Sequence, residues 1–225
     1  MNEDIAQSVQ KLAILFPPFL IAVIFHEFAH GLMAKKWGDN TAETMGRLTL
    51  NPIPHIDMIG TLLLPGIMLA TGAPFLFGWA KPVPINPSRF KKYRPGLFWV
   101  AFAGPLMNFF IAFVSACILV NVDRIFSSSD FYSEPARTML YYSIILNFAL
   151  GLFNLIPLPP LDGSKMVESV LSYGATKKYE MISQYSFFIL IGLIFTGVIR
   201  IIFIPIEFMT QTVIGIAALI FQVGV

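Results

Sequence analysis

Long apolar runs constrain this chain more than any other feature of its sequence. The first covers roughly 11–34, and further runs follow at about 97–120, 138–156, 183–202 and 205–224. Only 12% of the residues are charged, whereas a typical soluble domain carries about a quarter. Runs of this length, without the alternation of β-barrel strands, predict an all-α integral membrane protein.

A sixth apolar stretch, 58–79, is too interrupted to form a regular spanning helix. Its helix-breaking residues are Gly60, Pro65, Gly66, Gly72, Pro74 and Gly78. Backbone groups freed by such breaks must be shielded by protein or line a cavity when they lie inside a membrane. We therefore predict a re-entrant or irregular element here, and about five spanning helices in total.

The distribution of positive charge gives the orientation. If 58–79 enters and leaves on one side, eleven lysines and arginines lie on that side and four on the other. A full crossing would move the five positive charges of 81–94 across the membrane and remove this bias. Because positive loops stay in the cytoplasm, the re-entrant arrangement is favoured, and the first helix ends near the cytoplasmic face.

An H-E-x-x-H motif, His26 to His30, lies near the end of the first apolar run. Positions four apart share nearly the same helix face, so both imidazoles can bind one zinc ion. Glu27 projects to the side, near enough to deprotonate a water beside the metal. Ionisable groups at this depth cost on the order of 2.5 kcal/mol or more each, so three within five residues indicate a function.

Catalytic zinc has three protein ligands and one open position, so a third ligand must come from elsewhere. The candidates in or near apolar runs are Asp57, Asp162, Glu168, Glu207 and His55. We favour Asp162, because prolines before it end a helix and Gly163 permits a sharp turn after it. His55 lies in a polar loop, and we predict that it is not a ligand.

The HEFAH motif and the distant stretch NLIPLPPLDG, 154–163, together resemble the site-2 proteases. A third similar patch is GPLMN, 104–108, for which we favour helix packing over the alternative that Asn108 faces the site. The resemblance covers about 26–165 and is to the compact branch without PDZ or CBS domains. It implies an intramembrane zinc metalloprotease on an all-α membrane fold.

The resemblance also implies a role for each site residue. His26, His30 and Asp162 would hold one Zn²⁺ ion, Glu27 would be the general base, and Asn154 would steady the substrate backbone or the oxyanion. Residues 41–57 would supply a small β element that holds an unfolded substrate segment by edge pairing.

The same resemblance predicts the partners and the location. The substrate would be a transmembrane protein in a bacterial or archaeal cell membrane, with the active site toward the cytoplasm. Independently of the resemblance, the positive charge of the basic loop 81–94 predicts contact with membrane lipids. We expect no nucleic-acid partner. Residues 1–225 are predicted to form one protease domain, with a core at 11–165 and C-terminal helices at 183–224.

Two other functions compete with proteolysis. Histidines and carboxylates inside a membrane also suit a metal-ion transporter, although such transporters often show internal repeats and none is visible here. A non-catalytic relative that only binds membrane helices is the second alternative. An intact Glu27 argues against it, because loss of the base would be its simplest signature.

Overall fold

The computed structural model describes residues 2–71, 78–126, 131–197 and 200–222, and every regular element within these ranges is helical. Three helices are long and apolar enough to cross a membrane. They are α1 (Asn2–Trp37, of which Val9–Trp37 qualifies), α4 (Tyr93–Leu119) and α6 (Ser133–Asn154). The predicted all-α membrane class is thereby confirmed.

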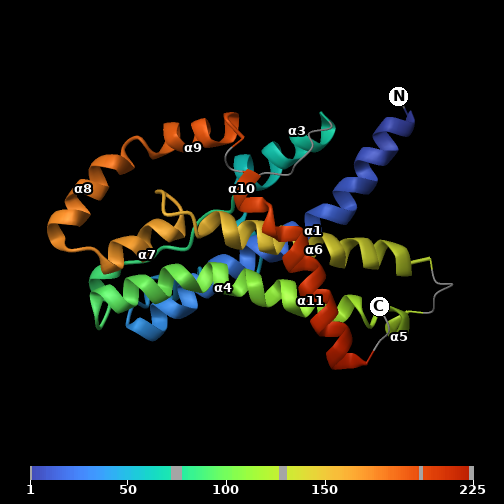
Figure 1. Ribbon diagram of the computed structural model, residues 1–225, viewed down its shortest axis with the longest axis horizontal. Coiled ribbons are helices and arrows are strands. Elements are labelled where there is room, and N and C mark those ends of the chain that lie inside the picture. The colour runs from blue at the N-terminus through green and yellow to red at the C-terminus, as the bar shows by residue number, and fades with distance from the viewer. Residues whose placement is uncertain (1, 72–77, 127–130, 198–199, 223–225) are drawn as a thin grey trace.

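Helices α4 and α6 lie side by side, and α1 packs against both (Figure 1). The apolar core between them is completed by α11 (Pro205–Phe221), which contributes Val213 and Ala217. Ala112, Ile144 and Ala217 are completely buried in this cluster. Small residues at helix contacts let the backbones approach closely, which is how helices associate when no water drives them together.

The outward faces of the same helices are apolar. Large side chains that stay exposed there include Ile21 and Leu32 on α1, and Leu106 and Phe110 on α4. Continuous apolar faces of this kind are unfavourable in water, whereas lipid hydrocarbon surrounds them without cost. The chain is therefore an integral membrane protein.

Within the described residues, three of the five predicted spans are long apolar helices. The apolar run at 183–202 is divided between α9 (Ser186–Phe195) and α10 (Arg200–Phe203), with Gly197 in a left-handed conformation at φ +75°. Helix α11 has 17 residues, fewer than the roughly 20 of a typical span. Hydropathy alone does not reveal where the backbone of such a run turns.

The β element predicted near 41–57 is wrong, because the described structure there is helical or irregular. It contains α2 (Thr41–Thr44) and a 3-10 turn, η1 (Ile53–His55). Pro52 and Pro54 have no N–H group to donate to a strand ladder, which disfavours a strand at this place.

The interrupted stretch 58–79 begins as a π-helical turn, η2 (Met58–Leu63), and continues as α3 (Leu64–Ala70). Asp57 caps the turn by accepting hydrogen bonds from the N–H groups of Ile59 and Gly60. The Trp79 N–H donates to Gly60 O at 3.1 Å and thus ties the end of the stretch to its beginning. Residues 72–77 lie outside the described residues, so the re-entrant course stays a prediction.

The remaining elements are short helices on the periphery. Helix α7 (Asp162–Val170) packs against α4, whereas α8 (Tyr173–Ser183) and α9 form an arc away from the three-helix core in Figure 1. The other two are η3 (Pro87–Arg89) and α5 (Val122–Ile125). One further segment, 79–86, has no regular secondary structure and passes beside α1, where the Val83 N–H bonds to Glu27.

Candidate metal centre

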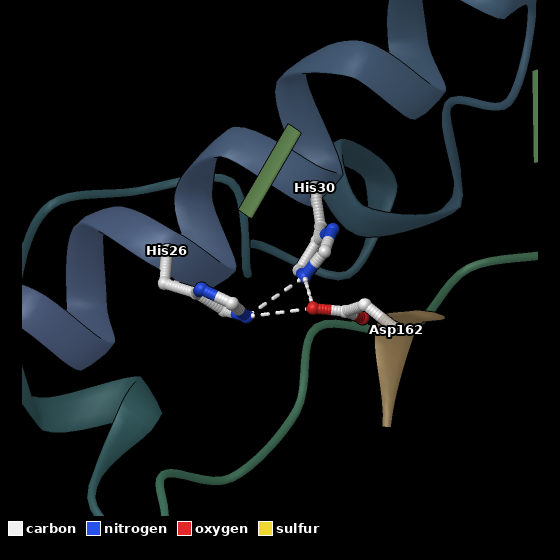
Figure 2. Close-up of side chains that lie close together, drawn as sticks. All are labelled: His26, His30 and Asp162. Carbon is white, nitrogen blue, oxygen red and sulfur yellow. Dashed lines mark hydrogen bonds and ion pairs between the residues drawn. The ribbon is translucent and has the colours of Figure 1, made fainter. Parts of the chain in front are cut away.

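Helix α1 and the start of α7 bring three potential metal ligands together (Figure 2). The Nε2 atoms of His26 and His30 are 3.0 Å apart. Asp162 Oδ2 lies 3.1 Å from the first and 3.2 Å from the second. Both histidines are 6% exposed, so the cluster faces the helix core and not the outer surface of α1.

The backbone around Asp162 explains how a residue so distant in sequence reaches α1. Helix α6 ends at Asn154, and a proline-rich turn leads directly to Asp162, the first residue of α7. A Cβ at Gly163 would collide with the carbonyl oxygens of Leu155 and Ile156. Only glycine lets α7 start this close to the end of α6, and Asp162 thereby points at the histidines (Figure 2).

The hydrogen bonds of the two rings show which nitrogens carry protons. His30 Nδ1 lies 2.7 Å from the carbonyl oxygen of Val100, which can only accept, so this nitrogen must donate. His26 Nδ1 faces the amide oxygen of Asn108 at 2.6 Å in the same way. In a neutral ring the lone pair is then on Nε2. Two imidazole lone pairs and one carboxylate oxygen therefore converge on a single point.

Such a convergence needs a cation. A shared proton would join two of the three atoms, whereas a metal ion joins all three. Asp162 Oδ2 is buried and accepts no hydrogen bond, which is costly for an unsatisfied carboxylate oxygen. Zinc binds nitrogen and oxygen at about 2.0–2.1 Å, and tetrahedral ligands are then about 3.4 Å apart. The observed separations are close to this value, so the donor set fits zinc.

Glu27 lies on α1 between the two histidines and is held by a backbone group. Its Oε2 accepts a hydrogen bond from the Val83 N–H at 2.7 Å. The segment 79–86, which carries Val83, is itself fixed, because Arg47 donates to the carbonyl oxygens of Lys81 and Pro82. The carboxylate is therefore directed by a part of the chain that is more than fifty residues away in sequence.

The other predicted site residues are not part of the cluster. Asn154 is the last residue of α6, and its Nδ2 donates to Leu150 O at 3.0 Å within the same helix. His55 is buried, with Nε2 2.8 Å from Thr49 O. Among the five candidates for a third ligand, Asp162 alone joins the two histidines within the described residues.

Two contributors to the site were missed by sequence reasoning. A Cβ at Gly104 would collide with His30 Nε2 and lie 2.6 Å from His26 Cε1, so both rings pack directly on this part of α4. The similarity of GPLMN, 104–108, to the site-2 proteases pointed to this part of α4, but we interpreted the pattern as helix packing. Val83 acts through its backbone N–H, for which the sequence carries no side-chain signal.

Comparison with known proteins places these motifs in a family. The family model described as "Peptidase family M50" matches residues 121–196, which include Asn154 and Asp162. The chain is 36% identical over 197 residues to the Bacillus subtilis protein named "Putative zinc metalloprotease YwhC", covering 87% of this chain and 86% of that protein. The chain belongs to peptidase family M50. The resemblance to the site-2 proteases and the zinc cofactor are thereby confirmed.

Two less similar relatives are also named as zinc metalloproteases. The Mycolicibacterium smegmatis protein "Putative zinc metalloprotease Rip2" is 29% identical over 79% of this chain and 65% of its own length. The "Zinc metalloprotease MJ0392" of Methanocaldococcus jannaschii is 28% identical over 74% of this chain and 36% of its own length. A comparison with solved structures gave no significant match. At the level of the family, the chain is a zinc metalloprotease.

Proposed function

We propose that this M50 protein hydrolyses a peptide bond within or near a transmembrane segment of a membrane-protein substrate. The convergence of His26, His30 and Asp162 inside the helix core carries the proposal. The two histidines lie in the part of α1 that is long and apolar enough to span the membrane. A substrate cut here must reach the metal at membrane depth.

Each residue has a defined role in this proposal. His26, His30 and Asp162 would hold the metal. Zinc, when bound, acts as a Lewis acid on a carbonyl group and makes water acidic enough to attack near neutral pH. Glu27 Oε accepts the proton of the attacking water and passes it to the leaving amine.

Asn154 is proposed to steady the substrate backbone or the oxyanion. One of its two amide hydrogens is used on Leu150 O, and the second is left for a substrate oxygen. Because Asn154 ends α6 just before the turn to Asp162, substrate that reaches the metal passes close to this helix end.

The active site is proposed to face the cytoplasm. Lys35 and Lys36 follow His30 in the last turn of α1, and the basic segment 81–94 lies at the same end of the helix, because the Lys91 N–H bonds to Trp37 O. Positive residues of this kind mark the cytoplasmic side of a membrane protein.

The first test is the zinc content of the detergent-purified protein, wild type beside His26→Ala and Asp162→Ala. We expect about one zinc per chain in the wild type and much less in both variants, because each removes one of three ligands. Zinc retained in Asp162→Ala would contradict its role as the third ligand.

The second test separates metal binding from hydrolysis. Glu27→Gln keeps the size of the side chain but cannot accept a proton, so it should retain zinc and lose cleavage of labelled single-span peptides in liposomes. Full cleavage by this variant would exclude Glu27 as the base. Zinc flux through the wild-type protein without any cleavage would instead support a metal transporter.

A further inference from the structure

A chain of buried polar side chains starts at the metal centre and runs through the membrane core. It leads from His26 on α1 to Asn108 on α4, then to Asn147 and Ser143 on α6, and ends at Ser115 on α4. Asn108 and Asn147 are 0% exposed. Polar groups at such depth are costly unless every one is satisfied, and they usually mark a function.

The backbone fixes the direction of every amide in this chain. Asn147 Nδ2 donates to the carbonyl oxygen of Ser143 at 2.8 Å, so its Oδ1 must face Asn108. Asn108 Nδ2 then donates to Asn147 Oδ1 at 2.9 Å and to the Ala22 carbonyl at 3.1 Å. Both of its hydrogens are thus used, and its Oδ1 is left facing His26 Nδ1 at 2.6 Å.

An amide oxygen can only accept, so this arrangement selects one tautomer of His26. Nδ1 carries the hydrogen, and the Nε2 lone pair is aimed at the point shared with His30 and Asp162. A flipped Asn108 amide would present hydrogens to Nδ1 and favour the opposite tautomer, which cannot bind metal through Nε2. Asn147 prevents the flip, because its own oxygen requires a donor.

We propose that Asn108 is a positioning residue for the metal centre, held in its working orientation by Asn147. The proposal rests on the proposed function, because it takes His26 Nε2 to be a metal ligand. Metal-binding histidines usually donate their second ring nitrogen to a carboxylate or a backbone carbonyl, which fixes the ring and its tautomer. His30 uses the Val100 carbonyl for this purpose, and His26 uses Asn108.

The position of Asn108 on α4 agrees with this role. It lies one helical turn after Gly104, whose missing side chain makes room for both histidine rings. The competing explanation is that the two asparagines only join α4 to α6, as interhelical hydrogen bonds do in many membrane proteins. That explanation predicts a loss of stability without a specific loss of metal affinity.

The test is the zinc affinity of the full-length protein in detergent, measured by competition with a chelator. Asn108→Ala should bind zinc about 10- to 100-fold more weakly, as found when outer-shell partners of metal ligands are removed. Asn147→Ala should weaken binding less, because Asn108 keeps its bond to the Ala22 carbonyl. Asn108→Asp retains an acceptor for His26 and should bind zinc more tightly than Asn108→Ala.

Two controls distinguish positioning from helix packing. Ile144→Ala opens a cavity in the α4–α6–α11 core without touching the polar chain, and Ser115→Ala removes only its far end. Both should keep wild-type zinc affinity even where they lower the unfolding temperature. Cobalt substitution gives a second measurement, because the visible spectrum of bound cobalt should change in Asn108→Ala and not in either control.

Wild-type zinc affinity in folded Asn108→Ala would overturn the proposal. If Asn108→Ala does not fold, the zinc affinity of Asn147→Ala is measured instead. A wild-type zinc affinity in Asn147→Ala would also overturn the proposal. If Ile144→Ala loses as much zinc affinity as Asn108→Ala, the asparagines contribute only through helix packing, which contradicts the proposal. A wild-type protein that binds no zinc would instead refute the proposed function itself, so the two failures are distinct.

Discussion

The backbone N–H of Val83 donates a hydrogen bond to Glu27 Oε2 at 2.7 Å. Val83 lies between Pro82 and Pro84, and neither proline has a backbone N–H group. Within 82–84, Val83 therefore supplies the backbone donor. The bond connects the H-E-x-x-H helix to the segment 79–86 and directs the carboxylate of the proposed base.

Val83→Pro should therefore impair catalysis without removing the metal. A hydrogen bond to a charged group contributes about 1.5–3 kcal/mol, so kcat should fall by about 10- to 100-fold. Zinc content should stay at the wild-type level, because the ligands are untouched. Val83→Ala is the matched control, since it keeps the N–H and loses only side-chain packing. Equal loss of kcat in both variants would show that packing, and not the hydrogen bond, matters.

Gly104→Ala should disturb the metal centre directly. The added methyl group would collide with the His30 ring and press on His26. Overpacking of this kind costs about 1–3 kcal/mol, and here the rings must move to relieve it, so zinc affinity should fall about tenfold or more. The control is Gly215→Ala on α11, where a Cβ meets nothing within 4 Å. Wild-type affinity in Gly104→Ala would show that the rings need no such room.

Removal of the metal should destabilise the whole helix core, because the cluster joins α1 to α7. A ligand present at 100 times its dissociation constant stabilises the folded state by about 2.7 kcal/mol. For a chain of this size, chelation should lower the unfolding midpoint by about 5–10 °C at a fixed heating rate, and added zinc should restore it. Asp162→Ala should show no response to either treatment, and a response equal to that of the wild type would place the bound zinc elsewhere.

Asp39 should make the stability of the protein dependent on acid pH. It is 1% exposed and accepts hydrogen bonds from Thr41 and from the Asn86 N–H at 2.6 Å. Burial alone would raise the pKa of this carboxyl group, but these hydrogen bonds, aided by the charge of Arg89, lower the pKa below its usual value. The stabilisation is therefore fully present above about pH 4 and is lost as the pH falls through the lowered pKa.

Asp39→Asn should accordingly lower the free energy of unfolding at pH 7 by about 1–3 kcal/mol and flatten its dependence on acid pH. Thermal unfolding between about pH 3 and pH 7 measures both effects. Asp123→Asn is the control, because that carboxylate is 60% exposed and its bond to Arg137 contributes little. A wild-type pH profile in Asp39→Asn would assign the acid sensitivity to another group.

Several features of the site follow from the sequence because they depend on local periodicity. His26 and His30 are four residues apart, so any α-helix places them on one face. Asp162 could be selected from five candidates because the prolines before it end a helix and Gly163, which is free of a side chain, permits a sharp turn after it. The β element at 41–57 was wrong, because the prolines there act against strand pairing. Of the five predicted spans, three correspond to long apolar helices among the described residues.

By itself, the sequence determined the membrane class, the metal-binding motif and the family, because apolar run length and i,i+4 spacing act within single segments. Only the tertiary structure decided which atoms orient the side chains of His26 and Glu27. The Asn108 amide orients His26 because α1, α4 and α6 pack together, and the carbonyl groups of Ala22 on α1 and Ser143 on α6 fix the direction of the two asparagine amides. The Val83 N–H reaches Glu27 because the segment 79–86 passes beside α1. Such contacts join residues distant in sequence, and no local pattern records them.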